Sequence, residues 1–419
     1  MTRFISIIKE DKKILLGYLI IFVAFIVFMP DSGPGGFDRI CWVAWANYIH
    51  GNGLQNIYKF GIDYLPLFQY FLFLYGVFQG NPENIIANIN SIKYITLAFD
   101  VFSAYLAFSF IRNHYKSKES AFLATLFILL NLAFLYNNIF YGQVDGIYTS
   151  MVFVSIYFGL KKKVSLSIFF VVLAINFKLQ AIIFLPLIGL LLFPEIWKNL
   201  SFKNLMIWLL PAVVLQLLIL LPFILSGDLF TLLNVVKSSM GKYPFVSMGA
   251  FNFWYWIFEE PNQIFDKQGI FGRSYNRYGL LLFVISLFFA IKPLIKQALL
   301  ALKNQMFTGI SKERILLIAT ITPLVFFYFN TQMHSRYMHP SILFGGIYAL
   351  YTRRPYAFIL LSIAYFLNIE SGIKILKNDI VPYEYFFFQP LFVSCIYFIA
   401  IILLYYELYK KPKPFKITN

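Results

Sequence analysis

Apolar runs alternate with short polar segments along the whole chain. The runs occupy residues 14–30, 64–78, 92–111, 121–136, 146–160, 164–177, 180–193, 205–226, 278–291, 315–330, 341–352, 355–368 and 390–406. A helix needs about 20 apolar residues to cross a bilayer, and it satisfies its own backbone hydrogen bonds there. The pattern therefore predicts an all-α polytopic membrane protein.

Composition supports the same class. Of 419 residues, 60% are hydrophobic and only 13% are charged, whereas soluble domains carry about 25% charged residues. This excludes a soluble enzyme, a disordered protein and, with only Cys41 and Cys395, a disulfide scaffold. The net charge of +16 would suit a nucleic-acid binder, but in this composition it indicates basic cytoplasmic loops beside anionic lipid. We expect membrane lipid as a partner and no nucleic acid.

The distribution of lysine and arginine predicts the topology. If run 64–78, which is short and begins at a Leu-Pro step, is a juxtamembrane or re-entrant helix, every basic cluster falls on one side, as the positive-inside rule requires. These clusters lie near the N-terminus and at 112–118, 161–163, 198–203, 292–314, 353–354 and 410–416. We therefore expect about 12 spans with both termini in the cytoplasm, and an uncleaved first span.

This topology places the longer segments outside, at 31–91, 137–145, 227–277, 331–340 and 369–389. It divides the chain into a transmembrane module at 1–226, an external loop with juxtamembrane helices at 227–277 and a second transmembrane module at 278–419. Most carboxylates lie in the external segments, so any chemistry is expected at the external face. Asp100 lies within a span, where a hydrogen bond between helices is expected.

The first external loop contains a candidate general base. Residues 37–50 form a weakly amphipathic helix suited to the membrane surface, with Trp42 and Trp45 in interfacial positions. Asp38 begins this helix, where the helix dipole favours its ionised form. Such a carboxylate can deprotonate a sugar hydroxyl; alternatively, Asp38 only caps the helix.

This loop resembles the first lumenal loop of lipid-phosphate-sugar-dependent glycosyltransferases of the GT-C class. The resemblance rests on Asp38, Trp45, the Ile57-Tyr58 pair and the Ile-Asp-Tyr-Leu-Pro-Leu segment at 62–67. It is especially similar to the loop of the dolichyl-phosphate-glucose-dependent glucosyltransferases, although residue 65 is leucine where their pattern has proline. The resemblance implies a GT-C fold, Asp38 as catalytic base, and Asp63 and Tyr64 lining the donor cavity.

Two further segments match the family in order and side. Gly142-Gln143-Val144-Asp145 resembles a G-Q-x-D stretch after the third span. Gln143 and Asp145 can hydrogen-bond sugar hydroxyls; the alternative is that Asp145 only caps the next helix. Lys178 resembles a lysine-bearing break between two half-length spans; lysine at membrane depth indicates function, with a lipid-linked phosphate as natural partner, unless it snorkels to the interface.

Residues 332–340 resemble the H-E-R-Y motif of these enzymes, with Ser335 in place of the acid. Arg336 offers a planar fork for phosphate oxygens, and His334 can donate to the same phosphate. The alternative is an interfacial Arg-Tyr belt. His334 and His339 have no companion acid close by, so no metal is expected. Asn252 and Trp254 form a weaker match, to an N-x-W pattern, and are candidates for contact with sugar or acceptor.

The expected function is therefore transfer of a hexose from a polyprenyl-phosphate sugar to a glycan or glycolipid acceptor, with inversion, Asp38 as base and no cofactor. Abundant Lys, Ile, Asn and Phe suggest an AT-rich bacterial genome, and hence a cytoplasmic membrane with the site facing outward. Two alternatives remain open: a flippase for lipid-linked saccharides, expected to carry charges along a central pathway, and a polysaccharide polymerase, expected to have arginine-rich external loops.

Overall fold

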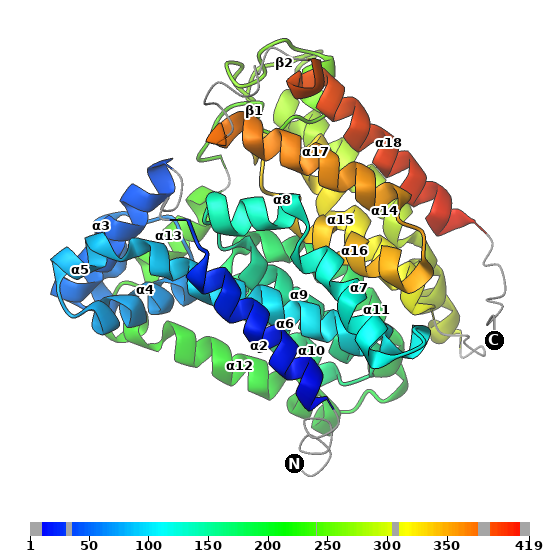
Figure 1. Ribbon diagram of the computed structural model, residues 1–419, viewed down its shortest axis with the longest axis horizontal. Coiled ribbons are helices and arrows are strands. Elements are labelled where there is room, and N and C mark those ends of the chain that lie inside the picture. Colours follow the sequence, from blue (N-terminus) through cyan, green and yellow to red (C-terminus); the bar gives the residue numbers. More distant parts are fainter. Residues whose placement is uncertain (1–10, 31–35, 240, 304–309, 376–385, 411–419) are drawn as a thin grey trace.

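The computed structural model describes residues 11–30, 36–239, 241–303, 310–375 and 386–410. It confirms the predicted all-α class (Figure 1). The first half of the described chain contains these elements: α2 (Lys12–Val27), α3 (Gly36–Asn52), η1 (Leu54–Phe60), α4 (Pro66–Gln79), α5 (Pro82–Ala87), η2 (Ile89–Ile92), α6 (Lys93–Ile111), η3 (Arg112–His114), α7 (Lys118–Leu129), α8 (Leu132–Leu135), η4 (Tyr136–Phe140), α9 (Asp145–Leu160), α10 (Val164–Phe177), η5 (Leu179–Phe184) and α11 (Leu185–Lys198).

The second half adds longer helices and four two-residue strands. Its elements are α12 (Phe202–Leu225), α13 (Leu229–Ser239), β1 (Ser247–Met248), η6 (Phe253–Trp256), β2 (Gly269–Ile270), β3 (Arg273–Ser274), α14 (Tyr275–Leu302), α15 (Lys312–Phe329), β4 (Met333–His334), α16 (His339–Thr352), α17 (Tyr356–Ile373), η8 (Phe386–Phe388) and α18 (Pro390–Tyr409). Strand β1 pairs in parallel with β4, and β2 pairs antiparallel with β3.

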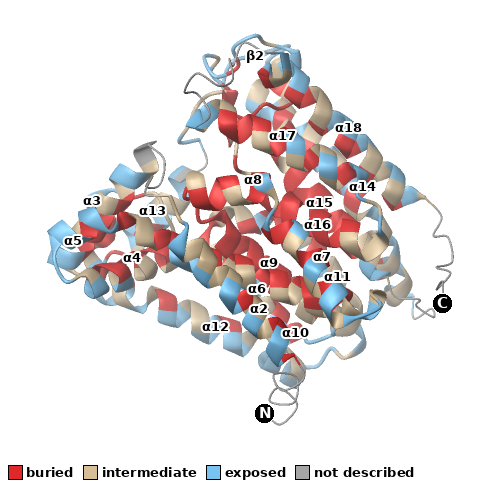
Figure 2. Ribbon diagram, in the orientation of Figure 1, coloured by how far each residue is buried: buried red, intermediate tan, exposed pale blue. Residues whose placement is uncertain are grey.

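Six helical segments of the described chain are long and apolar enough to cross a membrane, which indicates a multi-pass membrane protein. They are Ile89–His114, Leu179–Lys198, Phe202–Leu225, Tyr275–Leu302, Tyr356–Ile373 and Pro390–Tyr409. A seventh candidate is the pair Lys118–Leu129 and Leu132–Phe140, bent by 54°. Other predicted runs form shorter helices. Among them, α9 and α16 lie in the buried centre of the molecule (Figure 2).

Helices α12 and α14 lie at the periphery and expose many apolar side chains. Exposed residues on α12 include Leu210, Val213, Leu217 and Leu221, and those on α14 include Leu281, Val284, Phe288 and Phe289. Exposed apolar surface of this extent is unusual for a protein in water and is normal against lipid tails.

The helix formed by run 64–78 is too short to cross a membrane upright. It begins at Pro66, whose fixed φ suits the first helical turn, and ends at Gly80 in the left-handed region (φ 76°). Its 14 residues span about 21 Å, against the roughly 30 Å of a hydrocarbon core. Helices α3, α4 and α5 pack together as one group beside α12 (Figure 1).

Ion pairs join several of the basic loops. Buried Asp11, at the start of α2, pairs with Arg112 at 2.9 Å and Lys118 at 2.7 Å. Arg354 pairs with two acids, one at the start of α15 and one near the end of α18: Glu313 at 3.0 Å and Glu407 at 2.6 Å. The first two contacts join the α2 start to the α6–α7 loop, and the other two join the α16–α17 loop to the start of α15 and the end of α18. We call Asp11, Arg112 and Lys118 the Asp11 cluster.

Candidate active site

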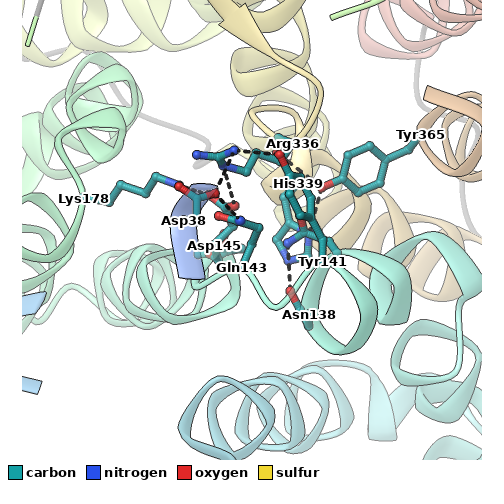
Figure 3. A network of polar contacts seen from close by, with 11 residues as sticks. Asp38, Asn138, Tyr141, Gln143, Asp145, Lys178, Arg336, His339 and Tyr365 are labelled. Atoms are coloured by element: carbon teal, nitrogen blue, oxygen red, sulfur yellow. Dashed lines mark hydrogen bonds and ion pairs between the residues drawn. The ribbon is translucent and has the colours of Figure 1, made fainter. Parts of the chain in front are cut away.

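Four segments that are distant in sequence bring charged side chains to one place (Figure 3). Asp38 comes from the first turn of α3, Asp145 from the first turn of α9, and Lys178 from the extended residue between α10 and η5. Arg336 comes from the α15–α16 loop. The predicted acid and two of the three predicted phosphate-binding residues are therefore neighbours. We call these four residues, with Gln143, the charged cluster.

Asp38 is held by an amide and faces a guanidinium. Its Oδ2 atom accepts a hydrogen bond from Gln143 Nε2 at 2.7 Å and lies 3.6 Å from Arg336 Nη1. The Asp38 side chain is 22% exposed, whereas that of Asp145 is fully buried. Asp38 is therefore the carboxylate of the cluster that a hydroxyl group arriving from outside can reach.

The second carboxylate neutralises the lysine. Lys178 Nζ donates to Asp145 Oδ1 in a buried ion pair, and Arg336 Nε lies 3.9 Å from Asp145 Oδ2. Two acids thus face two cations in a mostly buried site. Its effective dielectric constant is lower than that of water, so each charge interacts more strongly with its neighbours than it would in water. Neither the cap alternative for Asp145 nor snorkelling of Lys178 describes this geometry: no side-chain cap bond is present at the start of α9, and Lys178 is buried.

A π-helical turn positions Gln143 and Asp145. Such turns occur often at functional sites. In η4, Asn138 Nδ2 donates to Asp100 Oδ2 at 2.6 Å, so Asp100 makes the predicted hydrogen bond between helical segments. The chain then reverses at Gly142, whose φ of 66° favours glycine. Gln143 N donates back to Asn137 O at 2.9 Å, which fixes the backbone from which the Gln143 side chain reaches Asp38.

Residues from two helices fix the loop that carries Arg336. The Arg336 carbonyl accepts hydrogen bonds from His339 N at 2.9 Å and from Tyr365 OH at 3.3 Å. Tyr365 OH also lies 3.3 Å from His339 Nδ1. On its other side the loop continues from β4, which pairs with β1. These contacts fix the backbone at Arg336 and so restrict the position of its guanidinium group.

Three buried polar atoms of the charged cluster have no hydrogen-bond partner among the described residues. They are Gln143 Oε1, Asp145 Oδ2 and Arg336 Nε. More than about 90% of buried polar groups in proteins are hydrogen-bonded, and leaving one unpaired is costly. One free donor and two free acceptors at one place are the pattern expected where a polar ligand completes the bonding.

His334 lies beside the cluster as a neutral ring. Burial, with the fields of Arg336 and Lys178, holds the pKa of His334 well below its ordinary value of 6.5. Its ring packs edge-on against Tyr243 and Tyr337, at centroid distances of 5.0 and 5.1 Å. A neutral imidazole can still donate one N–H to a phosphate oxygen.

Asp63 and Tyr64 lie at the margin of the cluster. Asp63 Oδ2 pairs with Lys242 Nζ at 2.6 Å, which ties the segment between η1 and α4 to the 241–256 segment. Tyr64 packs on Trp45 at a centroid distance of 5.3 Å. Burial and the neighbouring Asp38 charge raise the pKa of Tyr64, so its phenol stays a hydrogen-bond donor.

The remaining two candidates, Asn252 and Trp254, hold the 241–256 segment to α15. Asn252 Nδ2 donates to Phe327 O at 3.1 Å, and Trp254 Nε1 donates to Phe329 O at 3.0 Å. Both side chains are buried. The structure does not bring them into the charged cluster, and their contact with sugar or acceptor stays a prediction.

Sequence reasoning missed two tyrosines of the site. Arg336 Nη1 donates to Tyr141 OH at 3.1 Å. The Tyr337 ring lies 5.6 Å from Lys178 Nζ and 5.7 Å from the Arg336 guanidinium carbon, within the range of cation–π attraction. Tyr141 directly precedes the Gly142–Asp145 segment, and Tyr337 is the tyrosine of the segment that resembles H-E-R-Y. These positions are the signal that could have identified them.

The described residues contain no group of three His, Cys, Asp or Glu side chains placed to hold a metal ion. No protein-family model matches the chain, and a search of curated proteins finds no similar one. The functional assignment therefore depends on the geometry and on the motif resemblance.

Proposed function

We propose that the protein is an inverting glycosyltransferase of GT-C fold that takes a hexose from a polyprenyl-phosphate sugar. The observation that carries the proposal is the meeting of Asp38 with Arg336, Gln143 and the Lys178–Asp145 pair, contributed by four distant segments. A reachable carboxylate beside two buried cations is the arrangement that a base-assisted displacement of a phosphate leaving group requires.

The reaction proceeds by one displacement. Asp38 takes the proton of an acceptor hydroxyl, and that oxygen forms a bond to the anomeric carbon. The bond between this carbon and the phosphate oxygen breaks, and the lipid monophosphate leaves with the electron pair. Arg336 and Lys178 stabilise the charge that develops on the phosphate, and His334 donates a hydrogen bond to it. The configuration at the anomeric carbon is inverted.

The ion pair between Arg336 and Asp38 links donor binding to activation of the base. Arg336 lies 3.6 Å from Asp38, within ion-pair distance but with no hydrogen bond between them. A phosphate entering beside the guanidinium accepts its free Nε–H and competes with Asp38 for its charge. Donor binding thus releases the carboxylate for the acceptor hydroxyl. The free acceptors Gln143 Oε1 and Asp145 Oδ2 then bind hydroxyl groups of the hexose.

The proposed membrane topology follows from the distribution of lysine and arginine along the chain. We place about 12 spans in a bacterial cytoplasmic membrane, with both termini inside and the charged cluster near the external face. The apolar runs that form helices shorter than a full span, such as α2, α9, α10 and α16, complete this number. The acceptor is a glycan or glycolipid on that face, and the reaction needs no cofactor.

The test uses purified protein with synthetic polyprenyl-monophosphate and polyprenyl-diphosphate sugars. We expect transfer from a monophosphate donor only, a product of inverted configuration, and a transfer rate about 10²–10⁴-fold lower for Asp38→Asn. Consumption of the diphosphate donor would favour a polymerase. Movement of lipid-linked saccharide across vesicles without its consumption would favour a flippase. Either result would overturn the proposal.

A further inference from the structure

A small hairpin on the side of the β segments ends in an exposed aromatic residue. Strands β2 and β3 are joined by Phe271 and Gly272, whose φ angles are 50° and 71°. Both values are typical of a type I′ turn, which favours Asn or Gly at these positions. Phe271 is nevertheless 93% exposed. A bulky residue that packs on little else, in a backbone conformation suited to glycine, has no explanation in the folding of the hairpin.

The hairpin is held rigidly. Tyr275 N donates to Gln268 O at 2.8 Å, and Tyr278 OH donates to Ile270 O at 3.1 Å. At its base, the buried Asp266 carboxylate accepts hydrogen bonds from three side chains, two of them on the α15–α16 loop: Asn276 at 3.1 Å, Thr331 at 3.1 Å and Gln332 at 2.6 Å. The hairpin is thereby fastened to the loop that carries Arg336.

The length of α14 places the hairpin at a membrane surface. Lys292 is the first charged residue inside this helix after Arg277 and lies 17 residues beyond Tyr275. That distance along an α-helix is about 26 Å, close to the roughly 30 Å of the hydrocarbon core. If Lys292 marks one edge of the core, the first turn of α14 lies at the other edge. The hairpin immediately precedes that turn, and β2 lies beside the starts of α14 and α18 (Figure 1).

The charges around the tip suit lipid headgroups. Lys267, Arg273 and Arg277 are exposed and form no ion pair with any described residue. Arg277 lies in the first turn of α14, where the helix dipole disfavours a cation, so the helix itself gains nothing from it. Two exposed acids, Glu259 and Glu260, precede the hairpin, but none of the three cations forms an ion pair with them. The cations can therefore bind the phosphate groups that every phospholipid carries.

From these observations we infer that the β2–β3 hairpin inserts Phe271 into the headgroup layer of the membrane, with Lys267 and Arg273 bound to lipid phosphates. Aromatic and basic residues are the usual anchors at this depth. Because Asp266 joins the hairpin to Thr331 and Gln332, this contact fixes the depth of the Arg336 loop relative to the bilayer. The inference goes beyond the proposed reaction and holds whether or not the protein transfers sugar.

The test measures depth directly. Phe271→Cys, in protein with Cys41→Ser and Cys395→Ser, is labelled with an environment-sensitive dye and placed in nanodiscs of phosphatidylcholine and phosphatidylglycerol. We expect strong quenching by nitroxides on the headgroup or high on the acyl chain, and iodide quenching several-fold weaker than for the free dye adduct in buffer. Iodide quenching equal to that of the free adduct, with no nitroxide effect, would overturn the inference. So would a response that appears only when a saccharide acceptor is added.

A matched pair of variants tests Phe271 itself. The dye is attached instead at Ile270→Cys, and this label is compared with Phe271 present and with Phe271→Gly. Glycine suits a φ of 50°, so the second substitution relieves the turn and preserves folding. We expect shallow-nitroxide quenching to fall several-fold without Phe271. Unchanged quenching would show that the aromatic ring is not the anchor.

Discussion

The charged cluster and the Asp11 cluster contain the same residue types but differ in how completely their atoms are bonded. Each has a fully buried carboxylate facing two cations. In the Asp11 cluster both Asp11 oxygens accept hydrogen bonds, and the cations Arg112 and Lys118 are part exposed, at 30% and 41%. In the charged cluster the cations are buried and three polar atoms have no hydrogen-bond partner among the described residues.

This difference separates a structural contact from a site. A completely bonded ion pair joins loops, and a ligand gains little by entering it. Incomplete bonding in a buried cluster costs stability, so it is expected where a ligand restores the missing bonds. The number of charged side chains alone does not distinguish the charged cluster from the Asp11 cluster.

The largest effect is expected from removing Lys178. Lys178→Met leaves the Asp145 carboxylate buried without its main partner, which costs about 3–5 kcal/mol in such pairs. Thermal unfolding in detergent measures the loss. The double variant Lys178→Met, Asp145→Asn removes both charges and should recover most of the stability while remaining inactive. Equal stability of the single and double variants would show that the buried pair is not coupled.

Replacing the planar guanidinium group of Arg336 should lower the rate of the reaction more than the stability of the fold. Arg336→Lys keeps the charge but loses the planar geometry that binds two phosphate oxygens. We expect kcat/KM for the donor to fall on the order of 100-fold, the range measured for single donors to developing charge. Donor titrations at saturating acceptor measure it. An unchanged value would remove Arg336 from the donor site.

The Asp11 cluster should show the reverse pattern. Asp11→Asn weakens two ion pairs, at an expected cost of about 1–3 kcal/mol in stability, with the transfer rate of the folded protein unchanged. Unfolding curves and rates per folded molecule, collected on the same sample, separate the two effects. A large loss of rate at full stability would contradict the assignment of this cluster to folding.

The smallest effect depends on pH. The pKa of His334 lies well below 6.5 in the folded protein, so the unfolded chain binds this proton more readily. The stability that this ring contributes is therefore complete above about pH 6.5 and falls on acidification, by at most about 1.4 kcal/mol per pH unit. His334→Asn should flatten the pH dependence of unfolding between pH 6.5 and 5. An unaltered profile would mean that the ring titrates normally.

Much of the architecture follows from the sequence because apolar runs and basic clusters act locally. They predict helices and a membrane location. The meeting of Asp38 with Arg336 is expected only from the resemblance of their motifs to those of GT-C glycosyltransferases. The partnership of Lys178 with Asp145 could not be predicted, because the contact depends on how the α10–η5 break packs against α9. For the same reason Asn252 and Trp254 resemble ligand-binding residues in sequence, but their polar atoms bond to α15.

The central claim is that Asp38 takes the acceptor proton. The most direct measurement compares single-turnover transfer by Asp38→Asn and Asp11→Asn with bound donor in the same membranes. The account predicts a loss of about 10²–10⁴-fold for Asp38→Asn, with donor binding retained, and the wild-type rate for Asp11→Asn. Wild-type turnover by Asp38→Asn would contradict it.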